Sequence, residues 1–382
     1  MASRLYSTTR RLYTQVAWLL DRLGIARIGS PTTVALIGLY VTGLILLDVR
    51  QTQTRVSHFL PGRCHDALNR LLRLMPLSTR ALMALLVLWA KRQGVAGYFC
   101  LDDVIVEKAF AKKLPWAAWT YSFAKKRKVY GLHMVVLLWC SCDGHWRIPV
   151  AFRLWRPKRS CAEHDYQTKL QLAERMVKEV VAQGLIARYI VFDTHYTAGW
   201  LTKTLTRLGL TWQGTLDPKT TVVWRGRKQR VAALAARLRL KWRKNLGLRA
   251  VALRVYAPKY GELRLVVTRN RHGNFEFIVS NDLSADLTSV VLRKHSRWSV
   301  ETIFRDTKQA GGLEACQCWV DQAIVRHVAF VLLTFVILQM MRTGPKESIG
   351  AVKERWQLEA ISHRELPPPP LKACPPQLRA TA

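Results

Sequence analysis

Three acidic residues of this 382-residue chain stand where they could hold metal ions. Asp103 and Asp193 each follow a short apolar, strand-like segment, and Glu301 lies in a segment with helical spacing. Two like charges at the ends of neighbouring strands are costly to bury unless a cation neutralises them. Mg²⁺ prefers carboxylate oxygens, and two Mg²⁺ ions about 4 Å apart activate water for attack on a phosphodiester. The pattern predicts a nuclease centre with two Mg²⁺ ions, whereas each acid taken alone could be an ordinary strand-end or capping residue.

Basic residues flank Glu301 at helical spacing. Arg297, Arg305 and Lys308 would share one helical face with it. An acid among cations suits a metal ligand with phosphate-binding side chains on both sides, but a salt-bridged helix facing solvent has the same spacing. Both interpretations stay open at this point. The adjacent Trp298 is interpreted as a core aromatic residue or as a platform for a flipped base.

The chain carries a large excess of positive charge. It has 60 Lys and Arg against 25 Asp and Glu, a formal net charge of +35. Such a surface predicts a polyanionic partner, DNA or RNA before an anionic membrane. An apolar fraction of 49% with 14 Trp excludes an intrinsically disordered chain. Two clusters are expected to contact DNA phosphates, namely Lys125, Lys126 and Arg127, and Arg225, Arg227, Lys228 and Arg230.

The cysteines and the apolar runs indicate a cytosolic protein. None of the eight Cys forms a C-x-x-C pair, which favours reduced thiols over a structural zinc site. The apolar runs 32–47 and 328–341 are shorter than the roughly 20 residues that cross a bilayer. We therefore expect two buried helices and no membrane partner.

The hydrophobic pattern predicts the elements that must bring the three acids together. Residues 1–97 show helical spacing and indicate a small helical domain. Strand-like and helix-like segments then alternate, which predicts a mixed α/β sheet whose inner strands end at Asp103 and Asp193. The expected strands are 98–105, 129–142, 146–155, 189–193 and 211–216, and the expected helices are 164–183 and 197–208.

A basic insertion interrupts this order before the Glu301 segment. Residues 217–250 contain eleven Lys and Arg against one acid, Asp217. Three strand-like runs follow at 250–256, 263–268 and 275–280. We therefore expect a β-rich insertion with a basic face, followed from Ser296 by the helix that carries Glu301.

Three segments of the sequence resemble the DDE transposases of bacterial insertion sequences. They are residues 101–108, 191–196 and 297–309, and the resemblance extends from about residue 30 to residue 342. The third segment is the most specific, because the family spacing is Tyr, two residues, Arg, three residues, Glu, six residues and Lys. Arg297, Glu301 and Lys308 match it, and the family role of this Arg and Lys is to position phosphates. Lys294 stands where the family has Tyr.

The resemblance implies a ribonuclease-H-like catalytic core with a β-strand insertion before the catalytic Glu. By this alignment Asp103, and not Asp102, is the first metal ligand, although Val104 replaces the Thr that usually follows. Asp193 and Glu301 would complete a catalytic triad that holds two Mg²⁺ ions, for which Mn²⁺ can substitute.

Five segments are expected from these observations together. They are a helical N-terminal DNA-binding domain (1–97), the first part of the ribonuclease-H-like core (98–216), the basic β-rich insertion (217–289), the second part of the core with the Glu301 helix (290–342), and a partly disordered C-terminal tail (343–382). The proline runs after Glu365 are the reason to expect disorder in the tail.

The resemblance implies cut-and-paste transposition. The protein would bind transposon ends, hydrolyse their phosphodiester bonds and join the freed 3′-hydroxyl groups to target DNA. Its partners would be terminal inverted repeats and target DNA, bound by a homodimer in the nucleoid of the bacterial cytoplasm. A catalytically inactive or repurposed DNA-binding protein derived from a transposase is the main alternative, and a structured-RNA nuclease with the same core is another.

Overall fold

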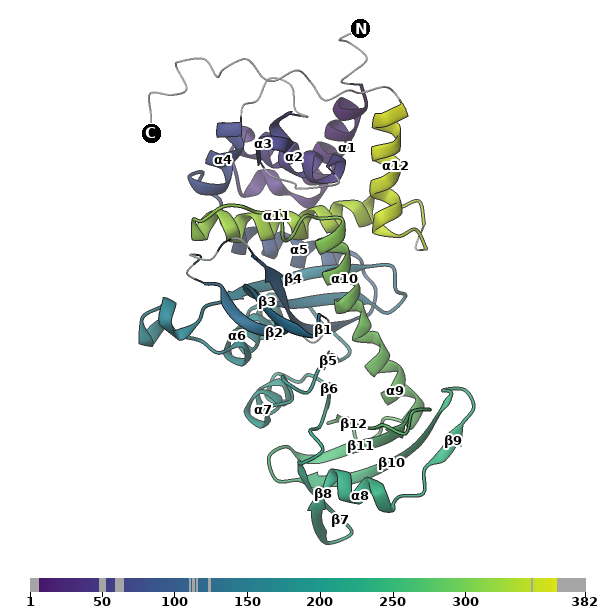
Figure 1. Ribbon diagram of the computed structural model, residues 1–382. Coiled ribbons are helices and arrows are strands. Elements are labelled where there is room, and N and C mark those ends of the chain that lie inside the picture. Colours follow the sequence, from purple (N-terminus) through teal and green to yellow (C-terminus); the bar gives the residue numbers. More distant parts are fainter. Residues whose placement is uncertain are drawn as a thin grey trace. The chain divides into compact units, whose positions relative to one another are not determined.

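The computed structural model describes residues 7–47, 53–58, 65–109, 111, 114, 116–122, 125–344 and 346–362. The chain divides into two compact units, whose elements are labelled in Figure 1. The first unit comprises Met1–Trp89, Ile105–Leu132 and Ile303–Ala382, and the second comprises Ala90–Val104 and His133–Thr302. Among the described elements, four contribute residues to both units, namely α5 (Thr79–Arg92), β1 (Gly97–Glu107), β3 (Arg127–Ser141) and α10 (Trp298–Gln309).

Helices make up most of the described part of the first unit, and local capping signals set where two of them begin. The Ser30 hydroxyl accepts a hydrogen bond from the Thr33 N–H at 3.2 Å, and Pro31 occupies the first helical position. The Ser78 hydroxyl accepts from the Ala81 N–H at the same distance, 3.2 Å. The helices are α1 (Ser7–Leu23), α2 (Pro31–Leu46), α3 (Gln53–His58), α4 (His65–Arg73), α5 (Thr79–Arg92), α11 (Asp321–Met340) and α12 (Ile349–Ser362).

Two apolar helices, α2 and α11, form the core of the first unit. The long helix α11 packs against α1, α2, α4 and α12. Within the described chain it is the one helix that is long and apolar enough to cross a membrane, and 89% of its apolar window is buried inside the protein. The prediction that residues 32–47 and 328–341 form buried helices is confirmed.

Two polar side chains of α11 lie inside this core. The Arg326 guanidinium donates to backbone carbonyls at and beyond the end of α4, those of Leu71, Leu72, Met75 and Leu77. His327 lies between the Tyr40 hydroxyl, 2.8 Å from Nδ1, and the Gly312 carbonyl, 3.0 Å from Nε2. Burial and the nearby Lys108 charge lower the pKa of His327 to about 3, so this ring is neutral.

The second unit is built on a mixed sheet with the strand order of a ribonuclease-H-like fold. That order is β4-β3-β1-β5-β6, where β4 spans Arg147–Trp155, β5 spans Ile190–Phe192 and β6 spans Trp212–Thr215. Strands β3 and β4 are antiparallel, whereas β1, β5 and β6 are parallel. Parallel strands need crossover connections. Helix α6 (Lys169–Ala182) leads from β4 to β5, and α7 (Gly199–Arg207) leads from β5 to β6.

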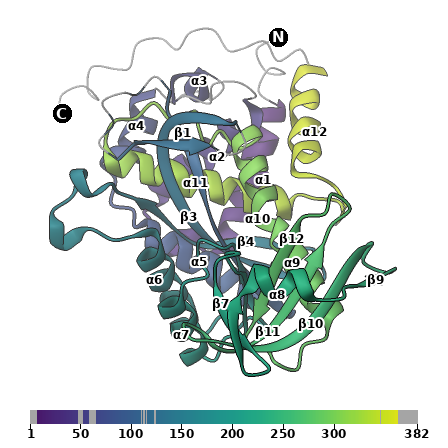
Figure 2. The same ribbon diagram turned by 60° about the horizontal axis from the view of Figure 1, so that its bottom comes forward.

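The insertion extends the same sheet, because its last strand pairs antiparallel with β6. Figure 2 shows its long strands side by side, with α9 beside them. Buried residues of β11, β12 and α9 form a small apolar core that includes Val266, Ile278 and Val290. The elements are β7 (Thr221–Trp224), β8 (Arg227–Arg230), α8 (Val231–Arg237), β9 (Lys241–Arg243), β10 (Leu248–Ala257), β11 (Gly261–Arg269), β12 (Phe275–Ser280) and α9 (Leu287–Ser296).

The expected fold class is confirmed, but several elements differ from the prediction. The inner strand expected to end at Asp103 continues to Glu107, because its residues beyond Asp103 also lie in the sheet. The helix expected over 164–183 starts at Lys169, because Thr168 and Gln171 form a capping box there. The helical region expected from Ser296 starts earlier, at Leu287, where Asp286 caps α9. The expected C-terminal tail contains α12, and its proline runs lie outside the described residues. The strand β2 (Ala118–Ser122), which pairs with the first residues of β3, was not predicted.

Candidate active site

Two parallel strands place two carboxylates next to each other. Strands β1 and β5 pair in a register that sets Leu101 opposite Phe192. Asp102 follows Leu101 within β1, Asp193 follows Phe192 directly after β5, and the Asp193 charge acts on Asp102. Asp102, and not Asp103, is therefore the acid of β1 that lies beside Asp193.

The Arg297 guanidinium connects the β1 acid to the acid of α10. Its Nη1 donates to Asp102 Oδ2 at 2.8 Å, and its Nη2 donates to Glu301 Oε1 at 2.5 Å. The four-residue spacing of Arg297 and Glu301 on one helical face makes the second contact possible. Asp102, Asp193 and Glu301 all lie close enough to Arg297 to act on its charge. The three acids thus gather around one cation.

Contacts from β1 hold the start of α10 in this position. The Tyr98 hydroxyl lies 3.1 Å from the Ser299 hydroxyl, and the Cys100 thiol lies 3.5 Å from the Ser296 carbonyl. Alternate residues of a strand point to the same face. Tyr98, Cys100 and Asp102 therefore form one row toward the α9–α10 junction, and the row ends in the carboxylate.

The charges of this site are strongly perturbed. Burial and the neighbouring Asp193 carboxylate raise the pKa of Asp102 to about 7, against the opposing effect of Arg297. Burial disfavours the Arg297 charge, but Asp102, Glu301 and Asp193 outweigh it and raise the pKa of Arg297 above its ordinary value. A site that raises the pKa of an acid in this way lacks positive charge, and a bound cation would supply it.

The neighbouring Asp103 points to a different set of partners. Its Oδ2 accepts from Lys169 Nζ at 2.6 Å and lies 3.9 Å from His133 Nδ1. Its Oδ1 accepts from the Tyr196 hydroxyl at 3.0 Å. Burial alone would raise the pKa of Asp103, but His133, Lys169 and Tyr196 outweigh it and hold that pKa well below its ordinary value. Burial and Asp103 raise the pKa of Tyr196 well above its ordinary value, so its phenol stays protonated.

The loop after β5 fixes the orientation of Asp193. Its Oδ1 accepts from the backbone N–H groups of His195 and Tyr196 at 2.9 and 3.3 Å. The Thr197 hydroxyl donates to the Asp193 carbonyl at 2.9 Å. Gly214 in β6 is required beneath this loop, because a Cβ there would lie 2.3 Å from Thr197 Oγ1.

The donor set fits a hard cation. Asp102, Asp193 and Glu301 offer only carboxylate oxygens, which Mg²⁺ and Mn²⁺ favour over softer metals. Among the described residues, no three His, Cys, Asp or Glu side chains converge tightly enough to form a preformed metal cage. Mg²⁺ does not need such a cage, because it commonly binds through one or two carboxylates together with substrate phosphates.

The hairpin of β7 and β8 carries the predicted basic cluster of the insertion. Trp224 pairs with Arg227 across the two-residue turn Arg225-Gly226, and both turn residues have positive φ. Arg225 stacks on the Trp224 ring, with its Cζ 4.6 Å from the ring centroid. Arg225, Arg227, Lys228 and Arg230 are all exposed. The structure thus presents this cluster to solvent, in the same unit as the three acids.

The other residues predicted to contact DNA differ in their exposure and in their ion pairs. Trp298 is 63% exposed, so its interpretation as a core aromatic residue is wrong. Lys125 and Arg127 both pair with Glu107, and Lys126, between them, has positive φ.

Two more of them lie on the part of α10 that belongs to the first unit. Arg305 pairs with Asp306 at 3.4 Å. Lys308 Nζ donates to the Ile105 carbonyl at 2.6 Å and to Glu314 Oε1 at 2.9 Å. Lys308 is therefore already bound within the fold.

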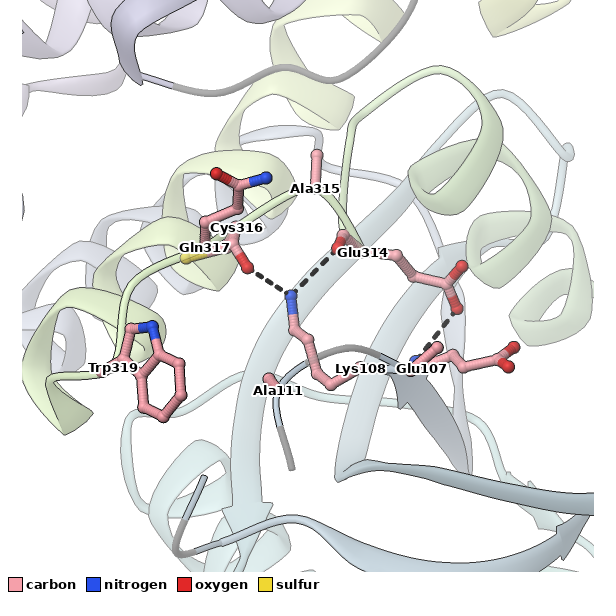
Figure 3. Close-up of a pocket in the computed structure, with 9 residues that line it drawn as sticks. Glu107, Lys108, Ala111, Glu314, Ala315, Cys316, Gln317 and Trp319 are labelled. Atoms are coloured by element: carbon pink, nitrogen blue, oxygen red, sulfur yellow. Dashed lines mark hydrogen bonds between the residues drawn. The ribbon is translucent and has the colours of Figure 1, made fainter. Parts of the chain in front are cut away.

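A cavity of about 720 Å³ in the first unit adjoins these contacts. Figure 3 shows Lys108 at its centre, donating from Nζ to the carbonyls of Glu314 and Cys316 at 3.0 and 2.7 Å. Glu314 also accepts from the Glu107 N–H at 3.1 Å, and Trp319 lies on the opposite side of Lys108. These polar groups join the end of β1 to the loop before α11.

Comparison with known families agrees with the fold. A ribonuclease-H-like sheet with carboxylates at the ends of its central parallel strands defines a class of metal-dependent nucleases. Residues 26–246 match a family described as DDE superfamily endonuclease, and the chain belongs to this family. A search of curated proteins finds no match. The chain is therefore of the nuclease or transposase type, and its family acts on DNA, generally with divalent metal ions.

Proposed function

We propose that this protein is a DNA transposase whose metal-binding acids are Asp102, Asp193 and Glu301. The observation that carries the proposal is the Arg297 bridge between Asp102 and Glu301 beside Asp193. Two Mg²⁺ ions, or Mn²⁺ in their place, would neutralise these acids and activate water against the scissile phosphate. Asp193 and Glu301 are the acids predicted from the sequence, and Asp102 takes the place of Asp103.

The choice of Asp102 follows from strand geometry and charge. Successive residues of β1 point to opposite faces of the sheet, so only one of the two acids can face Asp193 and α10. Asp103 already has an ammonium and a phenol as partners. Within the described part of the chain, Asp102 has Arg297 as its one cationic partner, and its pKa is raised to about 7, as expected for an acid that awaits a metal ion.

The side chains around the acids would bind and orient DNA. The family reaction hydrolyses a phosphodiester, which leaves a 3′-hydroxyl, and this hydroxyl then attacks a phosphodiester of target DNA and displaces its 3′ oxygen. Arg297, once a cation takes over its contact with Asp102, can donate to a phosphate beside the scissile bond. The exposed cluster at Arg225, Arg227, Lys228 and Arg230 would follow the backbone of the transposon end.

The biological setting belongs to the same proposal. The substrates would be the terminal inverted repeats of a transposon and a target DNA, in the nucleoid of the bacterial cytoplasm. A cut-and-paste reaction must hold two ends together, which supports a homodimer on DNA. The outward position of Trp298 supports contact with a base, as in enzymes that flip a nucleotide out of the duplex.

Cleavage of DNA that carries the inverted repeats flanking this gene tests the proposal. With Mg²⁺, the native protein should nick the repeat ends, and Asp193→Asn and Glu301→Gln should each lower the rate by about 10³-fold or more. Asp165→Asn is the matched control, because this acid is largely exposed. If the native protein and Asp193→Asn cut equally, or if neither cuts, the protein is not a nuclease of this mechanism and the inactive DNA-binding alternative is favoured.

A further inference from the structure

We propose that Asp103 and Tyr196 form a clamp that positions Asp102 and Asp193 at the distance a metal ion requires. Both are positioning residues, because their side chains contact each other and not the metal site. The inference rests on the proposed function. It assigns a role to Asp103, the acid of the Asp102-Asp103 pair that is not among the proposed metal ligands.

Each clamp residue holds one of the metal-binding acids through its backbone. The Asp103 N–H donates to Asp102 Oδ1 at 2.8 Å. The Tyr196 N–H donates to Asp193 Oδ1 at 3.3 Å. Each of these bonds orients one carboxylate. The orientation of Asp102 therefore depends on the backbone position of Asp103, and that of Asp193 depends on the backbone position of Tyr196.

The clamp side chains then tie these two backbone segments together. The Tyr196 hydroxyl donates to Asp103 Oδ1 at 3.0 Å, and Tyr196 is completely buried. The bond joins the middle of β1 to the loop after β5, beyond Phe192, where the pairing of the two strands stops. The strand register sets Asp102 beside Asp193, and this bond adds a tie just beyond the last paired position, Leu101 and Phe192.

Lys169 makes the clamp compatible with the charge of the site. A third carboxylate near Asp102 and Asp193 would add to their repulsion. Lys169 Nζ donates to Asp103 Oδ2 at 2.6 Å, which neutralises that charge locally. The capping box of Thr168 and Gln171 fixes the first turn of α6, and Lys169 is the first residue of that turn. The ammonium is thus placed by a local signal in the sequence.

The clamp predicts a specific defect when the phenol oxygen is removed. Losing a residue that orients metal ligands typically costs about 10- to 100-fold in metal affinity. Tyr196→Phe should therefore need at least about 10-fold more Mg²⁺ for half-maximal cleavage, with the rate restored near that of the native protein at saturating Mg²⁺. A residue that only stabilises the fold would not shift the metal requirement in this way.

Binding of Mn²⁺ alone, measured on the full chain by the loss of the free-ion electron paramagnetic resonance signal, provides a readout apart from activity. Tyr196→Phe should weaken Mn²⁺ binding by about 10-fold or more. Asp103→Asn should keep measurable binding, because its amide oxygen can still accept from Tyr196, whereas Asp102→Asn and Asp193→Asn should abolish it. Tyr256→Phe is the matched control, since this tyrosine is half-exposed on β10.

Each outcome bears on the clamp. Native Mn²⁺ affinity and a native Mg²⁺ requirement in Tyr196→Phe would overturn it and leave the proposed function intact. Complete loss of binding in Asp103→Asn, with binding kept in Asp102→Asn, would make Asp103 the ligand and overturn the clamp. Native binding and cleavage in Asp193→Asn would instead overturn the proposed function. If Tyr196→Phe does not fold, the comparison of Asp103→Asn with Asp102→Asn decides.

Discussion

Neutralising Asp102 and neutralising its neighbour Asp103 should change the free energy of unfolding in opposite directions. Replacing each by Asn keeps the size of the side chain and removes its charge. In the metal-free protein burial and Asp193 outweigh the pairing of the Asp102 carboxylate with Arg297, whereas the Asp103 carboxylate is paired with Lys169 and has a lowered pKa. Asp102→Asn should therefore stabilise the protein at pH 8, and Asp103→Asn should destabilise it.

The pKa of Asp102 sets the size of the first effect. The pKa of Asp102 is about 7 in the folded protein and near 3.9 in the unfolded chain. Between these two values, the contribution of Asp102 to the free energy of unfolding falls by about 1.4 kcal/mol for each unit of rising pH. Between these values the folded protein holds a proton that the unfolded chain has released, and this stabilisation is lost as the pH rises through 7. The free energy of unfolding of Asp102→Asn should exceed that of the native protein by roughly 2 to 4 kcal/mol at pH 8. The gap should widen by about 2.5 kcal/mol between pH 5 and pH 8.

The effect at Asp103 should have the other sign and no pH dependence in this range. The pKa of Asp103 is held well below its ordinary value, so the carboxylate is ionised in both states above pH 5. The stabilisation by the Asp103 carboxylate would be lost only as the pH falls below the pKa of this residue in the unfolded chain. Removing one partner of a buried ion pair costs about 3 kcal/mol. Asp103→Asn should therefore lower the free energy of unfolding by about this amount at both pH 5 and pH 8.

Urea denaturation with a chelator present, followed by tryptophan fluorescence at pH 5 and pH 8, measures both effects. Asp165→Asn, at an exposed position, should leave the midpoint unchanged. The electrostatic reasoning is refuted if Asp102→Asn destabilises the protein at pH 8 as much as Asp103→Asn does. It is also refuted if the difference between Asp102→Asn and the native protein does not grow with pH.

Three further predictions concern other parts of the chain. DNA fluorescence anisotropy can measure how the binding constant K depends on salt when the four basic residues of the hairpin, Arg225, Arg227, Lys228 and Arg230, are changed to Ala. The slope of log K against log salt should become flatter by up to about 0.9 for each phosphate that the hairpin no longer neutralises. An unchanged slope would exclude this hairpin from DNA binding. Gly199→Ala should cost about 1 to 3 kcal/mol in urea unfolding, because its Cβ would lie 2.6 Å from the Lys259 carbonyl, and an unchanged midpoint would contradict this contact. His327 has a pKa of about 3 when folded and about 6.5 when unfolded, so acid favours the unfolded state. The native protein should lose about 2 kcal/mol more than His327→Gln between pH 7 and pH 5, and parallel stability profiles would rule this out.

The strongly patterned elements of the chain were predictable from sequence. Long apolar runs predicted the buried helices α2 and α11, and β-branched runs predicted β1, β3 and β4 close to their observed bounds. The four elements between 217 and 250 were not assigned, because β7, β8 and β9 are only three or four residues long, and β8 and β9 are rich in Lys and Arg. Pairing with neighbouring strands, and not local hydrophobic pattern, makes those segments strands.

The site proposed here differs from the site predicted from the sequence in the choice between two adjacent acids. Asp193 and Glu301 stand out at a strand end and in a helical stripe with Arg297, and the structure brings both toward Asp102. Which of Asp102 and Asp103 faces them depends on the pairing of β1 with β5, a tertiary register that one sequence does not reveal. The row of Tyr98, Cys100 and Asp102 on one face of β1 was the available signal.

The remaining positioning residues carried no signal in the sequence. Lys169, Tyr196 and His133 come from three separate elements and meet only in the folded chain. Tyr196 lies three residues after Asp193 in a loop, where neither helical nor strand periodicity applies. The role proposed for Tyr196 rests on a bond to Asp103 within β1, 93 residues away along the chain.

A direct comparison of Asp102→Asn and Asp103→Asn in cleavage of transposon-end DNA tests the central claim most sharply. Rates are measured in single turnover at saturating Mg²⁺, so that weakened metal affinity does not obscure the chemical step. Asp102→Asn should lower the cleavage rate by about 10³-fold or more, and Asp103→Asn should lower it by no more than about 100-fold. The reverse order, with Asp103→Asn inactive and Asp102→Asn active, would contradict the central claim.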